Sequence, residues 1–225
     1  MNKKSTVDLI EYLQQFILEN RKKRFDEVIG NRTRHLTVVL EDIYQSHNAS
    51  AVMRSCDCFG VQDIHVIENR NKYSINPDVA LGSSNWLTLH KYHDTENNTL
   101  SCIISLKKRG YKIIAATPHK DDVTIHDLNI DHKTALVFGT ELHGISEDVL
   151  KHADGFVKIP MYGFTESFNI SVSVALCLHT LVERLHASTI KWQLSEDEKQ
   201  DVMLDWLRTS ISSSKMIEEK FLQGK

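Results

Sequence analysis

The fold of this chain is decided near its C-terminal third, where it reads Ile159-Pro160-Met161-Tyr162-Gly163-Phe164-Thr165-Glu166-Ser167-Phe168-Asn169-Ile170-Ser171-Val172-Ser173-Val174-Ala175-Leu176. The stretch begins as an extended segment, turns at Gly163 and continues as an apolar series with helical spacing. A loop therefore leads into a buried helix. Small polar residues at the junction, Ser167, Asn169 and Ser171, can cap that helix or hold a polar ligand. An ordinary capped helix would use the same residue types.

Short apolar runs alternate with helical patterns on the N-terminal side of this stretch. The runs expected as strands are residues 35–40, 63–67, 87–92, 111–117, 134–139 and 155–160. The segments expected as helices between them are residues 49–59, 97–109 and 146–153. Strands and helices that alternate at this spacing predict an α/β fold, with a parallel sheet covered by helices on both faces.

Amphipathic helical patterns flank this core at both ends. Residues 6–29 carry apolar positions with i, i+3, i+4 spacing, which predicts one or two helices joined near Asn20-Arg21. A second amphipathic pattern follows residue 190. We therefore expect an N-terminal helical extension at 1–30, a central domain at 31–190 and a C-terminal helical extension at 191–225.

Composition indicates an ordinary globular protein rather than a membrane protein. The 225 residues are 41% hydrophobic and 25% charged, with a net charge of −3, and no stretch approaches the ~20 consecutive apolar residues of a membrane span. The N-terminus lacks the apolar region of a signal peptide. We expect a cytoplasmic protein without membrane contact. The four cysteines lack disulfide or zinc spacing, so we expect reduced, mostly buried thiols and no metal.

Basic residues gather near the N-terminus although the net charge is negative. This basic patch, a candidate for binding phosphates, consists of Arg21, Lys22, Lys23, Arg24, Arg32 and Arg34. Screening confines the field of such a patch to about 8–10 Å at cellular salt, so a local patch can bind phosphates on a nearly neutral protein. A solvated helix face would show the same pattern.

Two further motifs precede the opening stretch, Asn48-Ala49-Ser50-Ala51-Val52-Met53-Arg54 and Leu136-Val137-Phe138-Gly139-Thr140-Glu141-Leu142-His143-Gly144-Ile145-Ser146. In this order, the three motifs resemble the signatures of the SpoU-type RNA 2′-O-ribose methyltransferases, which belong to the SPOUT class. The resemblance covers about residues 20 to 190. It implies a homodimer and a deep C-terminal trefoil knot, in which the segment around residues 135 to 180 passes through a loop.

The resemblance also implies S-adenosyl-L-methionine as the cofactor. No GxGxxG motif follows the first expected strand, so a Rossmann-type nucleotide site has no support. The loop from Gly139 to Gly144 lies between a strand and a helix, where backbone groups can approach a ligand closely. The residues that match the family's cofactor site are Thr117, Gly139, Ile159 and Phe168, of which Ile159 and Phe168 would pack against the faces of the adenine.

The residues that match the family's catalytic positions are Asn48, Arg54, Glu141, Ser167 and Asn169. The difficult step of ribose methylation is removal of a proton from the 2′-hydroxyl. Arginine is an unusual base because it is effectively always protonated. Arg54 would either act as a base assisted by a substrate phosphate, or clamp that phosphate and stabilise the developing alkoxide.

Helix geometry separates the first and last residues of the Asn48–Arg54 motif. Six residues at 3.6 per turn leave them on different faces of a helix, so we expect Asn48 in the preceding loop, at an N-cap position. There it would orient Arg54 or the ribose. By family match, Glu141 would bind or orient Asn48 and Arg54 or help shape the motif loops, and an ordinary surface carboxylate is the alternative. Ser167 and Asn169 would complete the ribose pocket and hold the methionine end of the cofactor. The resemblance also favours RNA as the ligand of the basic patch.

Within the family, the short chain with helical extensions is most similar to enzymes that methylate guanosine 18 in the D-loop of tRNA. Ribosomal RNA and the tRNA anticodon loop are alternative substrates for the same chemistry. A non-catalytic RNA-binding protein that keeps the fold is an alternative of a different class. The presence of Arg54, Glu141 and Asn169 speaks against that alternative.

Overall fold

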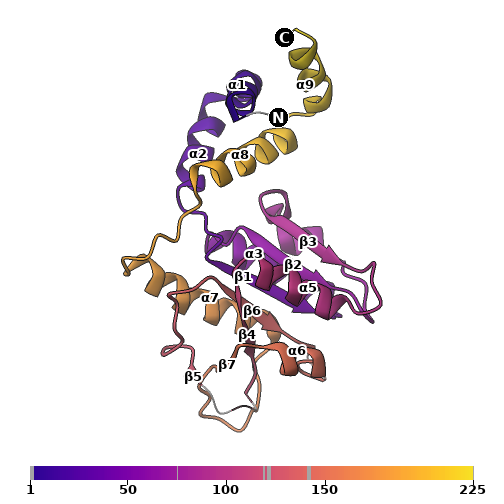
Figure 1. Ribbon diagram of the computed structural model, residues 1–225, viewed down its shortest axis with the longest axis vertical. Coiled ribbons are helices and arrows are strands. Elements are labelled where there is room, and N and C mark those ends of the chain that lie inside the picture. Colours follow the sequence, from indigo (N-terminus) through magenta and orange to yellow (C-terminus); the bar gives the residue numbers. More distant parts are fainter. Residues whose placement is uncertain (1–2, 75, 119, 121–122, 141–142, 225) are drawn as a thin grey trace. The chain divides into compact units, whose positions relative to one another are not determined.

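The computed structural model describes residues 3–74, 76–118, 120, 123–140 and 143–224. The chain forms two compact units, each with its own core. Unit 1 consists of Met1–Arg32 and Gln193–Lys225, and unit 2 is Thr33–Trp192. Unit 2 contains all the strands seen in the described residues (Figure 1). The hydroxyl of Thr33 donates a hydrogen bond to the backbone carbonyl of Trp192, so the first and last residues of unit 2 are tied together.

Unit 2 is built on a seven-stranded sheet with the order β3-β2-β1-β6-β4-β7-β5. The strands are β1 (Leu36–Glu41), β2 (Asp63–Ile67), β3 (Thr88–Tyr92), β4 (Lys112–Ala116), β5 (Val123–Thr124), β6 (Thr134–Phe138) and β7 (Gly155–Lys158). Every pairing is parallel, which confirms the predicted sheet. The central strands β1 and β6 are buried along their whole length, as expected for apolar runs in a parallel sheet. The two-residue β5 was not predicted.

Helices cover both faces of the sheet, as predicted (Figure 1). The helices of unit 2 are α3 (Ser46–Cys58), α4 (Pro77–Ala80), α5 (Asn98–Lys108), α6 (Glu147–His152) and α7 (Ile170–His186), with the 3-10 turn η2 (Ser83–Asn85). On one face, Met53 of α3 and Leu178 of α7 belong to the larger apolar core. On the other face, Leu106 of α5 and Val149 of α6 belong to a second core. The sheet is therefore the middle of three layers.

Unit 1 brings the two terminal segments of the chain together. Its helices are α1 (Lys3–Leu13), η1 (Gln14–Phe16), α2 (Glu19–Ile29), α8 (Glu196–Ser210) and α9 (Ser214–Gln223). The N-terminal helices are interrupted at Ile17 and Leu18 rather than near Asn20-Arg21, because Leu18 adopts an extended conformation and caps α2. The rings of Phe25 and Trp206 lie 5.3 Å apart in the core of this unit.

All four cysteines are free thiols, as expected. Cys56, Cys102 and Cys177 are buried and Cys58 is exposed. Burial raises the pKa of Cys102 and of Cys177 to about 12, so both remain protonated at neutral pH. None of the described helices combines the length and the apolarity needed to cross a bilayer.

Candidate active site

A cavity of about 700 Å³ opens at the carboxyl ends of β4, β6 and β7. Thr117 follows β4, Gly139 follows β6 and Ile159 follows β7, and all three line the cavity. Phe168 lines it from the segment that enters α7. Ligands of open α/β sheets bind at this edge, beyond the carboxyl ends of the strands. The structure thus brings the four expected cofactor-binding residues into one cavity.

The loop that follows β6 turns back on itself at this edge. The backbones of Thr140 and Gly144 exchange two hydrogen bonds of 2.9 Å, and Gly144 has a left-handed φ of 65°. A Cβ atom on Gly139 would overlap the carbonyl group of Gly144, so only glycine fits at the start of this loop. The described residues of this loop, Thr140, His143 and Gly144, line the cavity, where a ligand could approach them closely.

A pair of asparagines joins the first motif to the third. Asn169 caps α7, because its Oδ1 accepts hydrogen bonds from the backbone N–H and the hydroxyl of Ser171, at 2.9 and 2.6 Å. Its Nδ2 donates to Oδ1 of Asn48 at 3.1 Å. The predicted cap at the start of α7 is confirmed. Ser167 lines the same cavity and is exposed.

The predicted loop position of Asn48 is wrong. Helix α3 begins at Ser46, because Gln45 is extended and occupies the cap position, and its carbonyl accepts from the backbone N–H of Ala49. Asn48 is therefore a buried residue of the first helical turn, where its Nδ2 donates to the side chain of Gln45 at 3.2 Å. It reaches α7 from inside a helix rather than from a loop.

Arg54 lies on α3, near the end of the first motif, and is exposed. It lines neither this cavity nor the adjacent one described below, and it forms no ion pair within the described part of the chain. The structure does not place Arg54 against Asn48. Glu141, the third residue of this expected group, lies outside the described residues.

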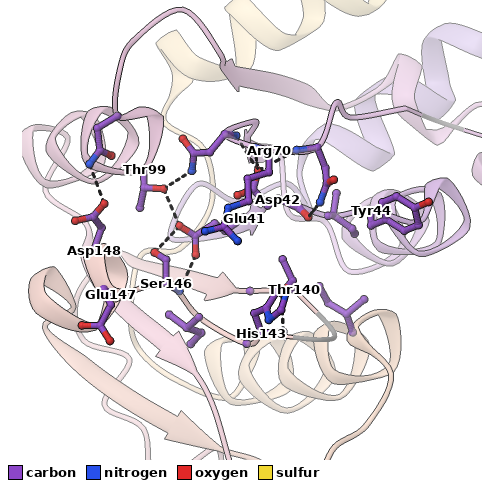
Figure 2. A pocket seen from close by; sticks show the side chains of 18 of the residues that line it. Glu41, Asp42, Tyr44, Arg70, Thr99, Thr140, His143, Ser146, Glu147 and Asp148 are labelled. Carbon is purple, nitrogen blue, oxygen red and sulfur yellow. Dashed lines mark hydrogen bonds between the residues drawn. The ribbon is translucent and has the colours of Figure 1, made fainter.

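A second cavity, of about 900 Å³, adjoins the first and shares Gln45, Gly139, Thr140 and His143 with it. Two carboxylates at the end of β1, Glu41 and Asp42, are buried in its wall. Figure 2 shows them beneath Arg70, with Thr140 and His143 on the opposite side. The sequence predicts only a polar loop here, because Glu41 and Asp42 lie outside the three motifs.

Both oxygens of Glu41 accept hydrogen bonds, from the start of α5 and from the loop before α6. Its Oε1 accepts from the hydroxyls of Thr99 and Ser146, both at 2.7 Å, and its Oε2 accepts from the backbone N–H of Ser146 at 3.1 Å (Figure 2). Ser146 in turn caps α6, as predicted. This carboxylate therefore fixes the end of the β6–α6 loop to the end of β1.

The six predicted RNA-binding residues do not form one exposed patch. On α2, Arg21, Lys23 and Arg24 are exposed and Lys22 is half-buried. Arg32 is 1% exposed, and its guanidinium lies 5.3 Å from the ring centre of Trp206. Arg34 bonds to the buried Asp63 at 3.0 Å. The prediction is therefore wrong for Arg32 and Arg34 as surface cations, because core packing and a distant acid hold them.

Asp63 lies at the amino edge of the sheet, opposite the two cavities. Its oxygens accept from Arg34 Nε at 3.0 Å and from Arg109 at 2.7 Å, and His90 lies 3.3 Å away. Burial alone would raise the pKa of Asp63, but the hydrogen bond from His90 and the two guanidinium groups hold it well below its usual range. Burial, with the neighbouring His90, lowers the pKa of His65 to about 3.

The donor atoms of Asp63, His65 and His90 lie within 4.8 Å of one another, a spacing that metal ligands also show. Both Asp63 oxygens are already bonded to guanidinium groups, however. A divalent cation would compete there with two positive charges, so the cluster is better described as a buried ion-pair network.

Comparison with known proteins gives concordant results. Residues 35–179 match the model of the SpoU rRNA Methylase family. The chain is 46% identical over 209 residues to a tRNA (guanosine(18)-2'-O)-methyltransferase of Borreliella burgdorferi, covering 93% of this chain and 94% of the relative. A TrmH/SpoU tRNA modifying enzyme of A. aeolicus is similar in structure, with a TM-score of 0.75 and 31% identity over 86% of this chain and 98% of that one.

A third relative shares the fold alone. The SpoU methyltransferase AviRb of Streptomyces viridochromogenes, in complex with the cofactor AdoMet, has a TM-score of 0.61 and is 20% identical, covering 72% of this chain and 65% of that one.

Proposed function

Because the chain belongs to the SpoU rRNA Methylase family, we propose that it methylates the ribose 2′-hydroxyl of a guanosine in tRNA, at position 18 of the D-loop, with S-adenosyl-L-methionine as methyl donor. The observation that carries the proposal is the 46% identity to a tRNA (guanosine(18)-2'-O)-methyltransferase over 94% of that relative. The protein is an RNA 2′-O-methyltransferase, and we propose that it acts on tRNA in the cytoplasm.

The first cavity suits the cofactor. Its volume of about 700 Å³ is in the range of small-molecule sites, and its wall combines apolar side chains with accessible backbone. Ile159 and Phe168 would pack against the adenine, and the backbone at Thr117 and Gly139 would accept and donate its hydrogen bonds. S-adenosyl-L-methionine supplies a methyl group bound to a positively charged sulfur.

The remaining chemistry belongs to residues of the first and third motifs. The Asn48–Asn169 pair and Ser167 would hold the ribose so that its hydroxyl points toward the first cavity. Arg54 would either take the hydroxyl proton, assisted by a substrate phosphate, or bind that phosphate and stabilise the alkoxide. Its exposed guanidinium is available for a phosphate in both versions. Glu141 would orient this group.

An apolar stripe on α7 supports a homodimer. Val172 and Leu176 lie four residues apart on α7 and are 44% and 37% exposed. Residues spaced by four lie on one face of a helix, and such a face usually covers another surface. Tyr162 and Phe164, just before the helix, are fully exposed as well. A second copy of the chain would bury this stripe.

Two further parts of the proposal rest on family membership. The methyltransferase domain spans residues 31–190 and contains a deep trefoil knot around residues 135 to 180. The terminal helical segments, at 1–30 and 191–225, assist in binding tRNA, with Arg21, Lys22, Lys23 and Arg24 as the phosphate contacts on α2.

The test is methyl transfer from labelled S-adenosyl-L-methionine to total unmodified RNA, with separation by size and identification of the labelled nucleoside. We expect label in tRNA, as 2′-O-methylguanosine. Label in ribosomal RNA, or in an anticodon loop, would support the proposed reaction but show that the proposed substrate is wrong. Absence of label from a preparation that binds the cofactor would favour a non-catalytic RNA-binding protein.

A further inference from the structure

The second cavity has no part in the assignment above, although it opens beside the ribose-binding asparagines. It lies at the end of β1 and is bounded by the β1–α3 loop, the loop after β2 and the loop after β6 (Figure 2). Asn48 lines this cavity, and Asn169, to which it is hydrogen-bonded, lines the first. A nucleoside whose ribose is held by these two residues would direct its base into this volume of about 900 Å³.

Asp42 is fixed in an uncommon conformation in the wall of this cavity. Its φ is 51°, a left-handed value that non-glycine residues seldom adopt, and the residue is 7% exposed. Its Oδ1 accepts from the backbone N–H groups of Asn69 and Arg70, at 2.7 and 2.8 Å, and its carbonyl accepts from Asn71. Backbone strain of this kind persists where the surroundings over-determine it, and it concentrates at binding sites.

The second carboxylate oxygen of Asp42 remains available. Within the described residues, Oδ2 accepts no hydrogen bond, and Asp42 lines the cavity. A carboxylate oxygen has two acceptor positions. The wall therefore offers a fixed acceptor that suits the N1–H and N2 amino donors of a guanine.

Arg70 and Tyr44 complete the recognition surface. The side chain of Arg70 is exposed, lines the cavity beside Asp42 and forms no ion pair with any described residue (Figure 2). Arginine pairs in a bidentate manner with O6 and N7 of guanine. Tyr44 also lines the cavity and is 79% exposed, and an exposed aromatic ring is a usual stacking platform for an unpaired base.

We propose that the second cavity binds the target guanine, with Tyr44 stacking on the base, Arg70 on O6 and N7, and Asp42 Oδ2 on N1–H and the N2 amino group. This inference rests on the proposed function and adds the base-reading residues to it. Adenine would present an amino group to Arg70 and an acceptor nitrogen to Asp42, so both contacts would become repulsive. The cavity thereby selects guanosine for methylation of its ribose.

The experiment compares Asp42→Asn with the wild type on tRNA transcripts that carry guanosine or inosine at the methylated position. Asparagine tolerates the left-handed backbone and can still accept from the two backbone N–H groups, so the loop should keep its shape. Inosine lacks only the N2 amino group. We expect the wild type to lose about tenfold in kcat/KM on inosine, whereas Asp42→Asn loses about tenfold to a hundredfold on guanosine and little more on inosine.

Three controls separate base reading from structural damage. Asp131→Asn makes the same change at an exposed carboxylate of unit 2 that lines neither cavity, and it should match the wild type. Tyr44→Ala should raise KM about tenfold while Tyr44→Phe, which keeps the ring, should not. The dissociation constant for S-adenosyl-L-methionine should remain unchanged in Asp42→Asn.

The outcomes distinguish this inference from the function on which it rests. Guanosine methylation by the wild type, with the same inosine penalty in Asp42→Asn as in the wild type, would overturn the base-reading role and leave the proposed function intact. A wild type that methylates another nucleoside would overturn both. A variant that loses cofactor binding along with activity would show that Asp42 only supports the loop, and this too would overturn the base-reading role.

Discussion

Buried acids lie at both ends of the parallel strands, and two of them, Asp63 at the amino ends and Asp42 at the carboxyl ends, are used in opposite ways. We call the amino ends the closed edge and the carboxyl ends the open edge. At the amino edge, both oxygens of Asp63 are bonded to guanidinium groups, and little hydrogen-bonding capacity is left. At the carboxyl edge, Asp42 keeps one oxygen available, and Arg70 has no ion-pair partner among the described residues. The comparison teaches that a polar cluster with all its partners inside the protein stabilises the fold, whereas a buried acid with an available oxygen lies at the proposed substrate site.

The largest effect is expected from removing the buried carboxylate of Asp63 at the closed edge. Asp63→Ala would leave Arg34, Arg109 and His90 without their shared acceptor, and breaking a buried ion pair in this way costs about 3–5 kcal/mol of the free energy of unfolding. Chemical denaturation measures the loss. The matched control is Asp94→Ala, which removes a surface carboxylate paired with His93 and should change stability by less than about 0.5 kcal/mol. Equal stability of the two variants would abolish the distinction between the edges.

The second largest effect is expected at the exposed Arg54 of α3, and it should appear in activity rather than in stability. Arg54→Ala should lower kcat by about 10²–10³-fold, as expected when one group that stabilises developing charge is removed. Because the side chain is exposed, the free energy of unfolding should stay within about 0.5 kcal/mol of the wild type.

Two variants complete this measurement. Arg54→Lys keeps the charge but not the planar fork, so it should recover only part of the rate. Lys72→Ala removes another exposed cation of unit 2 and should leave kcat unchanged. Full activity of Arg54→Ala would remove Arg54 from the reaction.

A third variant tests whether the tight loop after β6 serves the cofactor. In Gly139→Ala the added methyl group would overlap the carbonyl of Gly144, and such overpacking costs about 1–3 kcal/mol. We expect the dissociation constant for S-adenosyl-L-methionine to rise at least about fivefold, measured by calorimetry. Gly163→Ala is the control, because a methyl group there meets nothing within 4 Å. Unchanged affinity in Gly139→Ala would mean that the loop does not contact the cofactor.

The last effect concerns the pH dependence of stability and returns to the closed edge. The pKa of His65 is about 3 in the folded protein, against an ordinary value of 6.5, so between these values only the unfolded chain binds the proton. His65 therefore lowers stability as pH falls below 6.5, by about 1.4 kcal/mol per pH unit. Denaturation between pH 7 and pH 5 should show a shallower slope for His65→Gln, while His126→Gln, at an exposed site, should not. Parallel slopes for all three proteins would contradict the burial argument.

Much of the fold follows from the sequence because its signals are local. Apolar runs such as Leu36–Glu41 and Thr134–Phe138 are buried strands, and the cap residues Ser146 and Asn169 mark helix starts without outside help. The expected cofactor residues share one cavity, since parallel strands end at the same edge. The start of α3 was less predictable, because Gln45 is a poor cap by type and its extended conformation is what excludes Asn48 from that position.

The sequence alone could not predict which residues the charged side chains contact. Arg34 pairs with an acid 29 positions away, and Arg32 lies over Trp206, which is distant along the chain. A cluster of basic residues in a sequence does not show such long-range contacts. The acceptor at Asp42 was hidden for the same reason, since its geometry depends on backbone N–H groups of Asn69 and Arg70 from the next strand end.

The hydrogen bond between Thr33 and Trp192 has a consequence for how this architecture can vary. Because of this bond, the two ends of unit 2 lie next to each other. A segment added before Thr33 and one added after Trp192 would both be attached at the same point of unit 2, and neither would interrupt a strand. A short linker could join these two ends, and new termini could be made in a surface loop, to give a circular permutant of unit 2. Appended modules can therefore be exchanged during evolution without rebuilding the sheet.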